Sequence, residues 1–401
     1  MNNIERPKNV MFVITSMPVG GAETLLVNML YRFDPNRIRP FVCCLKEKDE
    51  LGEKIQADFP VFSGLINGKF DVGVVGRLRK LYRENQIDAV VTIGAGDKMF
   101  WGRLAARYSK VPVILSALHS TGWPDGVGRL NRLLTRITTG FIAVARSHGQ
   151  HLIKWEGFPE EKVFVISNGI DTERFQFSDT DRTNWRSKLG IPENSPVAGI
   201  VAALRPEKNH LLFVRAAHGV LQEIPNAHFV IVGDGPERPA IESLIAELGI
   251  GDSVHMAGCT HDIPGILSAC DLFALTSHNE ASPVSIMEAM SCQRPVVAPD
   301  VGSISESVLD GKTGFLVPAG DLEATVSKWS LLMSDATLSS DMGNAGRKHV
   351  ETESSLDSMT NGYTELVERL WQDNPTTAVS DGNHGASLQQ QIPISESCPS
   401  D

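Results

Sequence analysis

Short runs of apolar residues alternate along the chain with longer stretches in which apolar residues return every three or four positions. The runs are rich in Val and Ile and lack polar alternation, so they predict strands buried on both faces. The longer stretches, such as ETLLVNMLYRF and RPAIESLIAELG, have the spacing of amphipathic helices. Together they predict βαβ units and parallel sheets. The predicted strands form two series, at 10–16, 88–94, 112–118, 140–145 and 162–168, and then at 197–204, 228–233, 271–277 and 295–299.

A polar segment at about 171–196 separates the two series. We interpret it as the connection between two domains, because 401 residues exceed what a single core usually fills. The predicted fold class is α/β, with two Rossmann-like doubly wound domains that face each other across a cleft. The tail contains no Lys or Arg and few apolar residues, which is typical of disorder. The expected bounds are 1–172 for the N-terminal domain, 173–350 for the C-terminal domain, 351–372 for a last helix and 373–401 for the disordered tail.

Composition narrows the class of protein and the compartment. A formal net charge of -11 argues against a nucleic-acid binder, which needs a basic face. The six cysteines show no CxxC pair and no regular spacing, so we expect reduced, mostly buried thiols rather than disulfides or a zinc site. No apolar run reaches the roughly 18 residues of a membrane span. We therefore expect a cytoplasmic protein.

Two glutamates, Glu280 and Glu288, flank a Ser-Pro step in the stretch HNEASPVSIMEAM. Ser282 is expected to be the N-cap of a helix and Pro283 its first helical residue. Glu280 then lies in the loop before the helix, and Glu288 lies on its second turn. Residues eight apart on one helix are about 12 Å apart along its axis, which excludes an acid–base pair on a single helix.

The same helix start is suited to an anion, because the backbone N–H groups of Val284 and Ser285 lack partners within the first turn. A phosphate there would have a carboxylate on each side to accept hydrogen bonds from hydroxyl groups. The stretch therefore predicts a cradle for a phosphorylated sugar. The alternative is an ordinary capped helix with two solvated glutamates, and this stretch alone leaves both interpretations open.

Five motifs occur along the chain in an order that extends the argument beyond this stretch. They are GGAE at 20–23, SNGID at 167–171, ALRPEKNH at 203–210, VGDGPER at 232–238 and the E-x7-E segment at 280–288. In this order they resemble the family 4 glycosyltransferases, which are retaining enzymes of the GT-B fold. The resemblance implies an N-terminal acceptor domain and a C-terminal nucleotide-sugar donor domain. It also implies a last helix that crosses back to the N-terminal domain.

The resemblance assigns roles to single residues. It implies that Glu280 contacts hydroxyls of the donor sugar and that Glu288 contacts those of the nucleotide ribose. Arg205 and Lys208 take the positions of two cations on the donor diphosphate, where they would stabilise the charge of the leaving group. Their alternative interpretation is a pair of surface cations in a polar turn. His119, at the lip of the cleft, is expected to join Glu280, Arg205 and Lys208 in catalysis, although a histidine at a strand end is often structural.

Glycines and helix-start residues complete the expected donor site. Gly20 and Gly21 follow the first strand, where glycine permits a close approach of the backbone to a phosphate, or else forms a plain tight turn. Gly233 is expected to let the nucleotide approach, or to form a structural turn. The further residues expected to bind the nucleotide sugar are Cys259, Ser282, Val284 and Ser285.

Neither a metal nor a cofactor is expected. Asp179 and Asp181 have the spacing of an acidic DxD motif, but they lie in the connecting segment, and the family does not depend on such a motif. Peripheral contact with the inner membrane face is a further hypothesis. Arg129, Arg132 and Arg136 follow one helical face and could meet anionic lipid head groups, although a solvated basic face is the more ordinary interpretation.

The implied reaction transfers a sugar, with retention at the anomeric carbon, from a nucleotide diphosphate sugar to a saccharide or lipid-linked saccharide. UDP-sugars are the favoured donors, GDP-sugars are the alternative, and surface polysaccharide biosynthesis is the expected setting. Departures from the family pattern leave donor preference open. Ser282-Pro283 replaces the commoner Phe-Gly, and Ser303 replaces the second glycine before Glu306. Two other classes remain open, namely a sugar-nucleotide epimerase of the same fold and a non-catalytic nucleotide-sugar binder.

Overall fold

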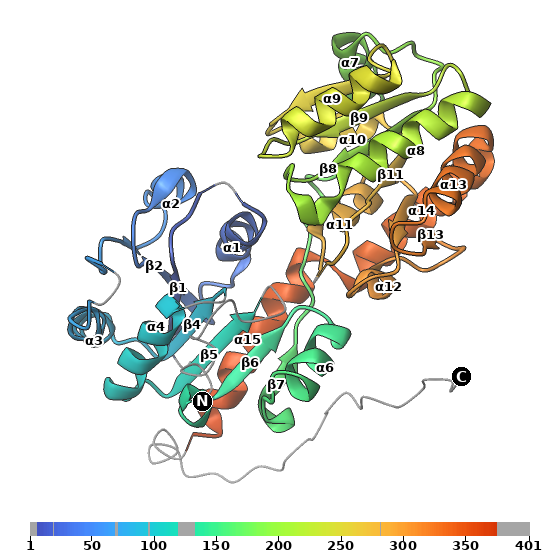
Figure 1. Cartoon of the computed structure of the whole chain (residues 1–401). Coiled ribbons are helices and arrows are strands. Elements are labelled where there is room, and N and C mark those ends of the chain that lie inside the picture. Colours follow the sequence, from blue (N-terminus) through green and yellow to red (C-terminus); the bar gives the residue numbers. More distant parts are fainter. Residues whose placement is uncertain are drawn as a thin grey trace.

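The computed structural model describes residues 6–18, 20–68, 71–94, 97–118, 133–280 and 282–374. These residues form two α/β domains, each built around a parallel sheet, which confirms the predicted fold class (Figure 1). We call the domain around strands β1–β7 the N-domain and the domain around strands β8–β13 the C-domain. All nine strand runs predicted from the apolar pattern are strands in the structure.

The N-domain sheet has the strand order β3-β2-β1-β4-β5-β6-β7. Its strands are β1 (Lys8–Ile14), β2 (Ile38–Cys44), β3 (Val61–Phe62), β4 (Ala89–Ile93), β5 (Val113–Leu118), β6 (Gly140–Ala143) and β7 (Val163–Val165). The helices of this domain are α1 (Gly21–Arg32), α2 (Asp49–Ile55), α3 (Val74–Glu84), α4 (Asp97–Tyr108) and α6 (Arg146–Lys154), with the 3-10 turns η1 (Leu134–Arg136) and η2 (Glu160–Lys162). Neighbouring residues of β1 enter opposite layers. Phe12 packs with residues of α1, and Val13 packs with residues of α3 and α4, so both sheet faces are covered.

The C-domain sheet has the strand order β10-β9-β8-β11-β12-β13. Its strands are β8 (Val197–Val201), β9 (His228–Val232), β10 (Val254–Gly258), β11 (Leu272–Ala274), β12 (Val296–Pro299) and β13 (Gly314–Val317). The helices are α7 (Asp179–Leu189), α8 (His210–Glu223), α9 (Arg238–Leu248), α10 (Ile263–Ala269), α11 (Val284–Ser291), α12 (Ile304–Ser307), α13 (Leu322–Ser334) and α14 (Ala336–Glu353), with the 3-10 turn η3 (Pro206–Lys208). Phe213 of α8 and Trp329 of α13 are in edge contact in the larger core, and Trp185 of α7 lies in the core on the other face.

Each sheet reverses its strand order once. The reversal lies between β1 and β4 in the N-domain and between β8 and β11 in the C-domain. Loops that leave the carboxyl ends of such a strand pair run to opposite faces of the sheet and open a crevice, where ligands of open α/β sheets bind. A ligand site is therefore expected at the loops after β1, β8 and β11.

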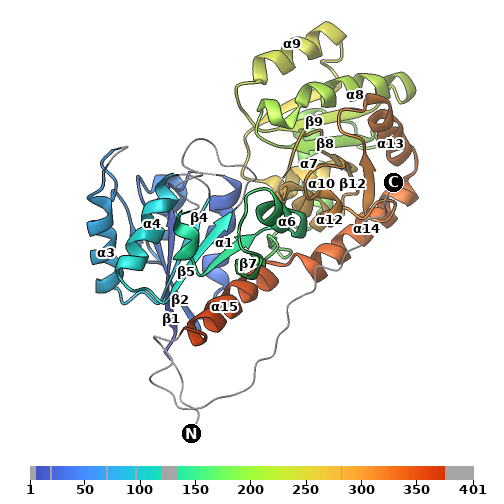
Figure 2. The same cartoon turned by 60° about the horizontal axis from the view of Figure 1, so that its bottom comes forward.

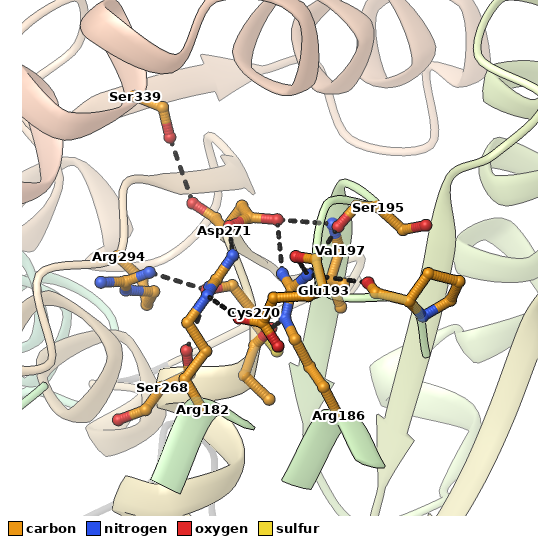
Figure 3. A network of polar contacts seen from close by, with 12 residues as sticks. Arg182, Arg186, Glu193, Ser195, Val197, Ser268, Cys270, Asp271, Arg294 and Ser339 are labelled. Atoms are coloured by element: carbon orange, nitrogen blue, oxygen red, sulfur yellow. Dashed lines mark hydrogen bonds and ion pairs between the residues drawn. The ribbon is translucent and has the colours of Figure 1, made fainter. Parts of the chain in front are cut away.

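The polar segment between the two strand series is not an open connection, because residues 179–189 form α7 and pack on the C-domain. Arg186 is completely buried, and its guanidinium donates to Asp271 Oδ2 at 2.9 Å and to the Ser195 carbonyl at 2.8 Å. Asp271 also accepts from Arg182 at 2.8 Å and from the Val197 backbone N–H at 2.8 Å (Figure 3). This network ties α7 to the amino ends of β8 and β11.

A cavity of about 500 Å³ opens beside this network and is lined by Arg182, Asp271 and Arg294. It lies at the amino edge of the sheet, opposite the edge that carries the crevice. Arg182 is bound to Asp271, and Arg294 donates to the Cys270 carbonyl at 2.7 Å and the Cys292 carbonyl at 2.9 Å. The lining charges are therefore largely paired within the protein, and we place no function in this cavity.

The last helix, α15 (Leu356–Gln372), returns to the N-domain, and Figure 2 shows it continuing the line of α14 along one side of the molecule. Its apolar face carries Leu356, Met359, Tyr363, Leu366 and Val367 into the N-domain core. The outgoing and returning chains pair where Ile170 bridges to Ser355. The chain thus crosses between the domains twice, side by side.

Several expectations concern residues outside the described part of the chain. They are the role of His119, the basic face at Arg129 and Arg132, and the tail from residue 375 onward. At the start of the expected tail, Asn374 is placed by a hydrogen bond from its side chain to the Pro112 carbonyl at 2.7 Å.

Within the described ranges, no helix combines the length and the apolar character needed to cross a membrane.

Candidate functional site

The loops that leave β8 and β11 are tied together by hydrogen bonds to backbone carbonyls at the carboxyl edge of the C-domain sheet. Thr276 Oγ1 donates to the Lys208 carbonyl at 3.1 Å and the Asn209 carbonyl at 3.0 Å. The His278 backbone N–H donates to the Glu207 carbonyl at 2.9 Å. The turn that carries Arg205 and Lys208 therefore lies against the loop that leads to Glu280, at the point where the strand order reverses.

Glu280 is buried, with 8% of its surface exposed, and it is held through a single oxygen. Its Oε1 accepts from Lys208 Nζ at 2.5 Å and from Ser277 Oγ at 2.7 Å. Its Oε2 accepts no hydrogen bond from the described residues. A carboxylate fixed in this way keeps one oxygen ready for a hydroxyl donor.

The backbone of Glu280 is fixed by the start of α12. Its carbonyl accepts from the Ser303 N–H at 3.2 Å. Gly302 has a φ of 59°, and a Cβ at this position would lie 1.7 Å from the Glu280 carbonyl oxygen. Only glycine fits between these two backbones, so the first of the paired positions before Glu306 is explained by the close approach to Glu280.

Arg205 differs from Lys208 because its side chain is 64% exposed and its one ion pair with a described residue is distant, at 4.0 Å from Glu207. Both cations stand on the turn after β8, with Arg205 as the N-cap of η3 and Lys208 as its last residue. Both cations therefore lie at the crevice, the guanidinium of Arg205 exposed and the ammonium of Lys208 bound to Glu280. Such a pair suits the two phosphates of a nucleotide diphosphate.

The helix after Glu280 begins one residue later than expected. Pro283 has a φ of -74° and a ψ of 106°, so it is the extended N-cap, and α11 starts at Val284. Ser282 therefore lies outside the helix and is not its N-cap, which corrects the prediction. The physical reason is that Pro283 is extended while its carbonyl already accepts a hydrogen bond from the Ile286 N–H at 3.1 Å, which is the geometry of an N-cap residue. No side chain caps α11 in the described structure, so the first-turn N–H groups of Val284 and Ser285 are left to a ligand or to water.

Glu288 lies on the second turn of α11 and is partly buried. Burial raises the pKa of its carboxyl group to about 7, and the positive charge of Arg174 opposes that rise to a smaller extent. The group is therefore poised near neutral pH, where a small change in its surroundings alters its charge.

The turn after β9 explains Gly233 by packing. Gly233 has a φ of 137°, and a Cβ would lie 2.0 Å from the Ala202 carbonyl oxygen. Its N–H donates to the Gly258 carbonyl at 2.9 Å, which places this turn beside the loop of Cys259. The geometry favours the structural-turn interpretation of Gly233, while Cys259 is exposed beside it.

In the N-domain, the loop after β1 leads directly into α1. Gly20 is the extended N-cap of α1, and a Cβ on it would lie 2.4 Å from the Glu23 carboxylate. A Cβ on Gly21 would meet nothing within 4 Å. Burial raises the pKa of Glu23 above its ordinary value. The open backbone at Gly21 is thus the part of this loop that a ligand could approach.

The structure brings Arg205, Lys208, Glu280 and α11 together in the C-domain and places Gly20 and Gly21 in the other domain. Sequence reasoning missed Ser277, which orients Glu280, and His210, which follows Lys208 in the ALRPEKNH motif. The place of His210 in that motif was the one available signal.

His210 is 2% exposed, and neither ring nitrogen has a hydrogen-bond partner among the described residues. Burial lowers the pKa of His210 to about 4, and the charge of Lys208 adds to the shift. The ring therefore stays neutral beside the cation.

Among the residues that the structure describes, no group of three or more His, Cys, Asp or Glu side chains is arranged to hold a metal ion.

Comparisons with known proteins agree with the two-domain fold and identify the family. The family model described as Glycosyltransferase Family 4 matches residues 19–174, and the model described as Glycosyl transferases group 1 matches residues 181–349. The two matches follow the division into N-domain and C-domain and together span most of the chain.

Two curated relatives have names that specify a donor. A UDP-Gal:alpha-D-GlcNAc-diphosphoundecaprenol alpha-1,3-galactosyltransferase of Escherichia coli is 28% identical over 302 residues, which cover 72% of this chain and 78% of that protein. A GDP-mannose-dependent alpha-(1-6)-phosphatidylinositol monomannoside mannosyltransferase of Mycolicibacterium smegmatis is 26% identical over 296 residues, which cover 68% and 74%.

Among solved structures, Anabaena Alr3699/HepE in complex with UDP matches with a TM-score of 0.79 and 22% identity, over 90% of this chain and 100% of that one. At this identity the likeness concerns the fold, which is GT-B. The family matches and the shared fold lead to one conclusion: the chain belongs to the glycosyltransferases of family 4 and group 1 and is an enzyme of that class.

Proposed function

We propose that the enzyme transfers a sugar from a nucleotide diphosphate sugar, with UDP-sugars favoured over GDP-sugars, to a saccharide or lipid-linked saccharide. The single observation that carries the proposal is the Lys208–Glu280 pair, 2.5 Å apart, at the reversal of the C-domain strand order. It combines a cation for the diphosphate with a carboxylate for the sugar in one place.

The division of labour follows from charge. The leaving nucleotide diphosphate gains negative charge as the bond to the sugar breaks, and Arg205 and Lys208 supply fixed positive charge beside it. The open N-terminus of α11 adds backbone N–H donors for the same phosphates. Glu280 accepts hydrogen bonds from sugar hydroxyls through Oε2, and Glu288 accepts them from the ribose. The proposed reaction uses Arg205, Lys208 and the N-terminus of α11, rather than a divalent cation, as counter-charges for the diphosphate.

We infer retention at the anomeric carbon from the family resemblance. In this scheme the acceptor hydroxyl attacks the face from which the diphosphate departs, and an oxygen of the departing phosphate takes the acceptor proton. The bond from the anomeric carbon to the phosphate oxygen breaks, and the bond to the acceptor oxygen forms. No covalent enzyme intermediate is required, so Glu280 positions and stabilises the sugar and is not a nucleophile.

The names of the relatives support the acceptor class. The Escherichia coli protein is named for a diphosphoundecaprenol-linked acceptor and the mycobacterial one for a phosphatidylinositol mannoside. We propose an acceptor of this lipid-linked or saccharide kind and a role in surface polysaccharide biosynthesis. Such an acceptor would bind the N-domain across from Glu280, at a cytoplasmic membrane face that the protein contacts peripherally.

A panel of thermal shifts with UDP, GDP, ADP and their common sugar conjugates tests the donor part. Ligands that bind the folded state raise the melting temperature, and the rise grows with the ratio of ligand concentration to Kd. We expect stabilisation selective for one nucleotide, and loss of that stabilisation in Arg205→Ala. A matched control is Arg215→Ala on α8, which leaves the turn after β8 intact. No shift with any nucleotide would contradict the proposal.

The preferred nucleotide sugar is then incubated with and without acceptor saccharides. The retaining transferase is supported if sugar is transferred only when an acceptor is present and if NMR shows that the product keeps the anomeric configuration of the donor. A changed sugar nucleotide released without acceptor would indicate the epimerase instead. Binding without any product would indicate a non-catalytic binder. Full activity after chelation of divalent cations is expected, and loss of activity that Mg²⁺ restores would contradict metal independence.

A further inference from the structure

Beyond the donor site, the C-domain touches the N-domain through the carboxylate of Glu306. The backbone N–H groups of Arg146 and Ser147 both donate to Glu306, each at 2.7 Å. These are the first two residues of α6, and Ala145, its N-cap, provides no side-chain cap. Glu306 on α12 therefore caps an N-domain helix from the C-domain, and both views place α12 beside α6 (Figures 1 and 2).

The carboxylate of Glu306 suits the start of α6 in both charge and hydrogen bonding. A helix start has unpaired N–H groups and a partial positive charge, and a carboxylate is its preferred partner. The two acceptor oxygens are used separately, because Arg146 binds Oε2 and Ser147 binds Oε1. The contact therefore fixes an orientation as well as a distance.

The same short segment also reaches the donor site. Three residues before Glu306, the Ser303 N–H donates to the Glu280 carbonyl, and Gly302 makes the close backbone approach described above. Between them Ile304 is completely buried and anchors α12 in the C-domain core. Segment 302–306 thus holds Glu280 at one end and the N-domain at the other.

We propose that Glu306 is a positioning residue for transfer, which sets the angle between the two domains at the loop that carries Glu280. The two chain crossings are paired where Ile170 bridges to Ser355, so the covalent connections between the domains lie close together. Connections that lie close together form a hinge, and non-covalent contacts such as that of Glu306 then set the rotation about it. The inference rests on the proposed function, because a donor on the C-domain must meet an acceptor on the N-domain in a defined geometry.

Four variants of the full-length chain test the proposal. Glu306→Ala removes the contact, and Glu306→Gln keeps the shape but loses the charge and one acceptor oxygen. Glu247→Ala, at an exposed position of α9, is the matched control. The double variant Glu306→Ala with Ala145→Ser gives α6 a cap of its own without restoring the link between the domains. Each is measured for nucleotide Kd, for kcat and donor KM, for Tm, and for radius of gyration by small-angle scattering.

For Glu306→Ala we expect kcat to fall by about tenfold or more, because small misplacements of reacting groups are costly, while nucleotide Kd and donor KM stay within about threefold. The radius of gyration should increase, and Glu306→Gln should be intermediate. In the double variant, the serine hydroxyl introduced by Ala145→Ser should recover Tm without recovering kcat. Recovery of kcat in that variant would overturn the proposal and reduce Glu306 to a helix cap. An unchanged kcat and scattering curve in Glu306→Ala would overturn it as well.

The proposed function and this inference fail in different ways. Absence of nucleotide binding and transfer in the unmodified protein would contradict the proposed function. In that case the scattering comparison between Glu306→Ala and Glu247→Ala would still test whether Glu306 sets the angle between the domains. Equal scattering curves for the two variants would exclude that role.

Discussion

Glu280 is oriented by three different groups before any ligand arrives. Lys208 and Ser277 hold its Oε1, and Ser303 holds its carbonyl. Groups that are already oriented need no reorganisation during the reaction, which is why fixed charges and dipoles contribute strongly to catalysis. The free Oε2 is the one part of this side chain that the described protein does not use. The residue's role is therefore best tested by changing its charge and retaining its shape.

Replacement of Glu280 by Gln is expected to lower kcat by about 100-fold or more, because a neutral amide is a weaker acceptor and leaves Lys208 without its ion pair. The nucleotide Kd should change by less than about fivefold, since the diphosphate contacts remain. Steady-state kinetics and calorimetric titration measure the two quantities. Glu247→Gln serves as the control, and a near-normal kcat in Glu280→Gln would refute the assignment.

The raised pKa of Glu288 predicts that donor binding is linked to proton release. Its pKa of about 7 means that much of the carboxyl group is protonated in the free enzyme near pH 6. In the proposed donor complex, ribose hydroxyls donate to the ionised form, so binding should lower this pKa and release a proton. Between about pH 8 and about pH 6 the affinity for the donor should fall by roughly tenfold.

Calorimetric titrations in two buffers of different ionisation enthalpy measure the released proton, with the intact nucleotide sugar as ligand because its esterified diphosphate does not titrate near neutral pH. Glu288→Gln should bind without proton release. His210 will not contribute, since its pKa of about 4 keeps it neutral throughout. The raised pKa of Glu288 also fixes the sign of its effect on the free energy of unfolding. Its stabilising contribution is complete below about pH 4.5 and is lost as pH rises through about 7.

At the scale of elements, the apolar pattern located nine of the strands, including the three-residue strands β7 and β11. It missed β2, whose IRPFVCC sequence interrupts the apolar run with Arg39 and Pro40, and it missed β3, β10 and β13, most of whose residues are only partly buried. It also took α7 for a connection, because the helix is mostly polar and is attached through the buried Arg186. The charge of Arg186 can be buried because Asp271, distant in sequence, pairs with it. Local periodicity contains no information about such a partner.

The Asp271 network gives a stability prediction for α7. In Asp271→Asn the buried Arg186 would lose its charged partner, which is expected to cost about 3–5 kcal/mol of unfolding free energy. Urea denaturation followed by tryptophan fluorescence reports it, because Trp185 stands beside Arg186 on α7. Asp252→Asn, in an exposed turn, is the control. Equal unfolding midpoints for the two variants would show that the network contributes little.

For the whole molecule, the resemblance carried by the motifs predicted the two-domain fold class. Because each motif is local, it could also name residues such as Lys208 and Glu280, which the structure brings together in the candidate site. The relation between the domains could not be predicted in this way. Glu306 and the start of α6 are 160 residues apart, and their contact depends on how two separately folded sheets are placed. The return of α15 was expected from the family resemblance alone, and its packing shows what the helix contributes to the N-domain. It supplies side chains to a core whose strands end at Val165.

The N-domain is therefore expected to depend on a helix that follows the C-domain in sequence. Each fully buried apolar side chain of α15 contributes about 1.5–3 kcal/mol, so loss of the five named above approaches or exceeds the usual stability of a domain. A chain that ends at Ser354 should lose the folded N-domain and expose its sheet face, whereas a chain that ends at Asn374 keeps every contact of α15. Limited proteolysis with mass spectrometry would show early cleavage within residues 6–165 in the shorter chain only, beside a protected C-domain that still binds nucleotide. Equal protection of the N-domain in both chains would show that α15 is dispensable and that the N-domain closes its core without it.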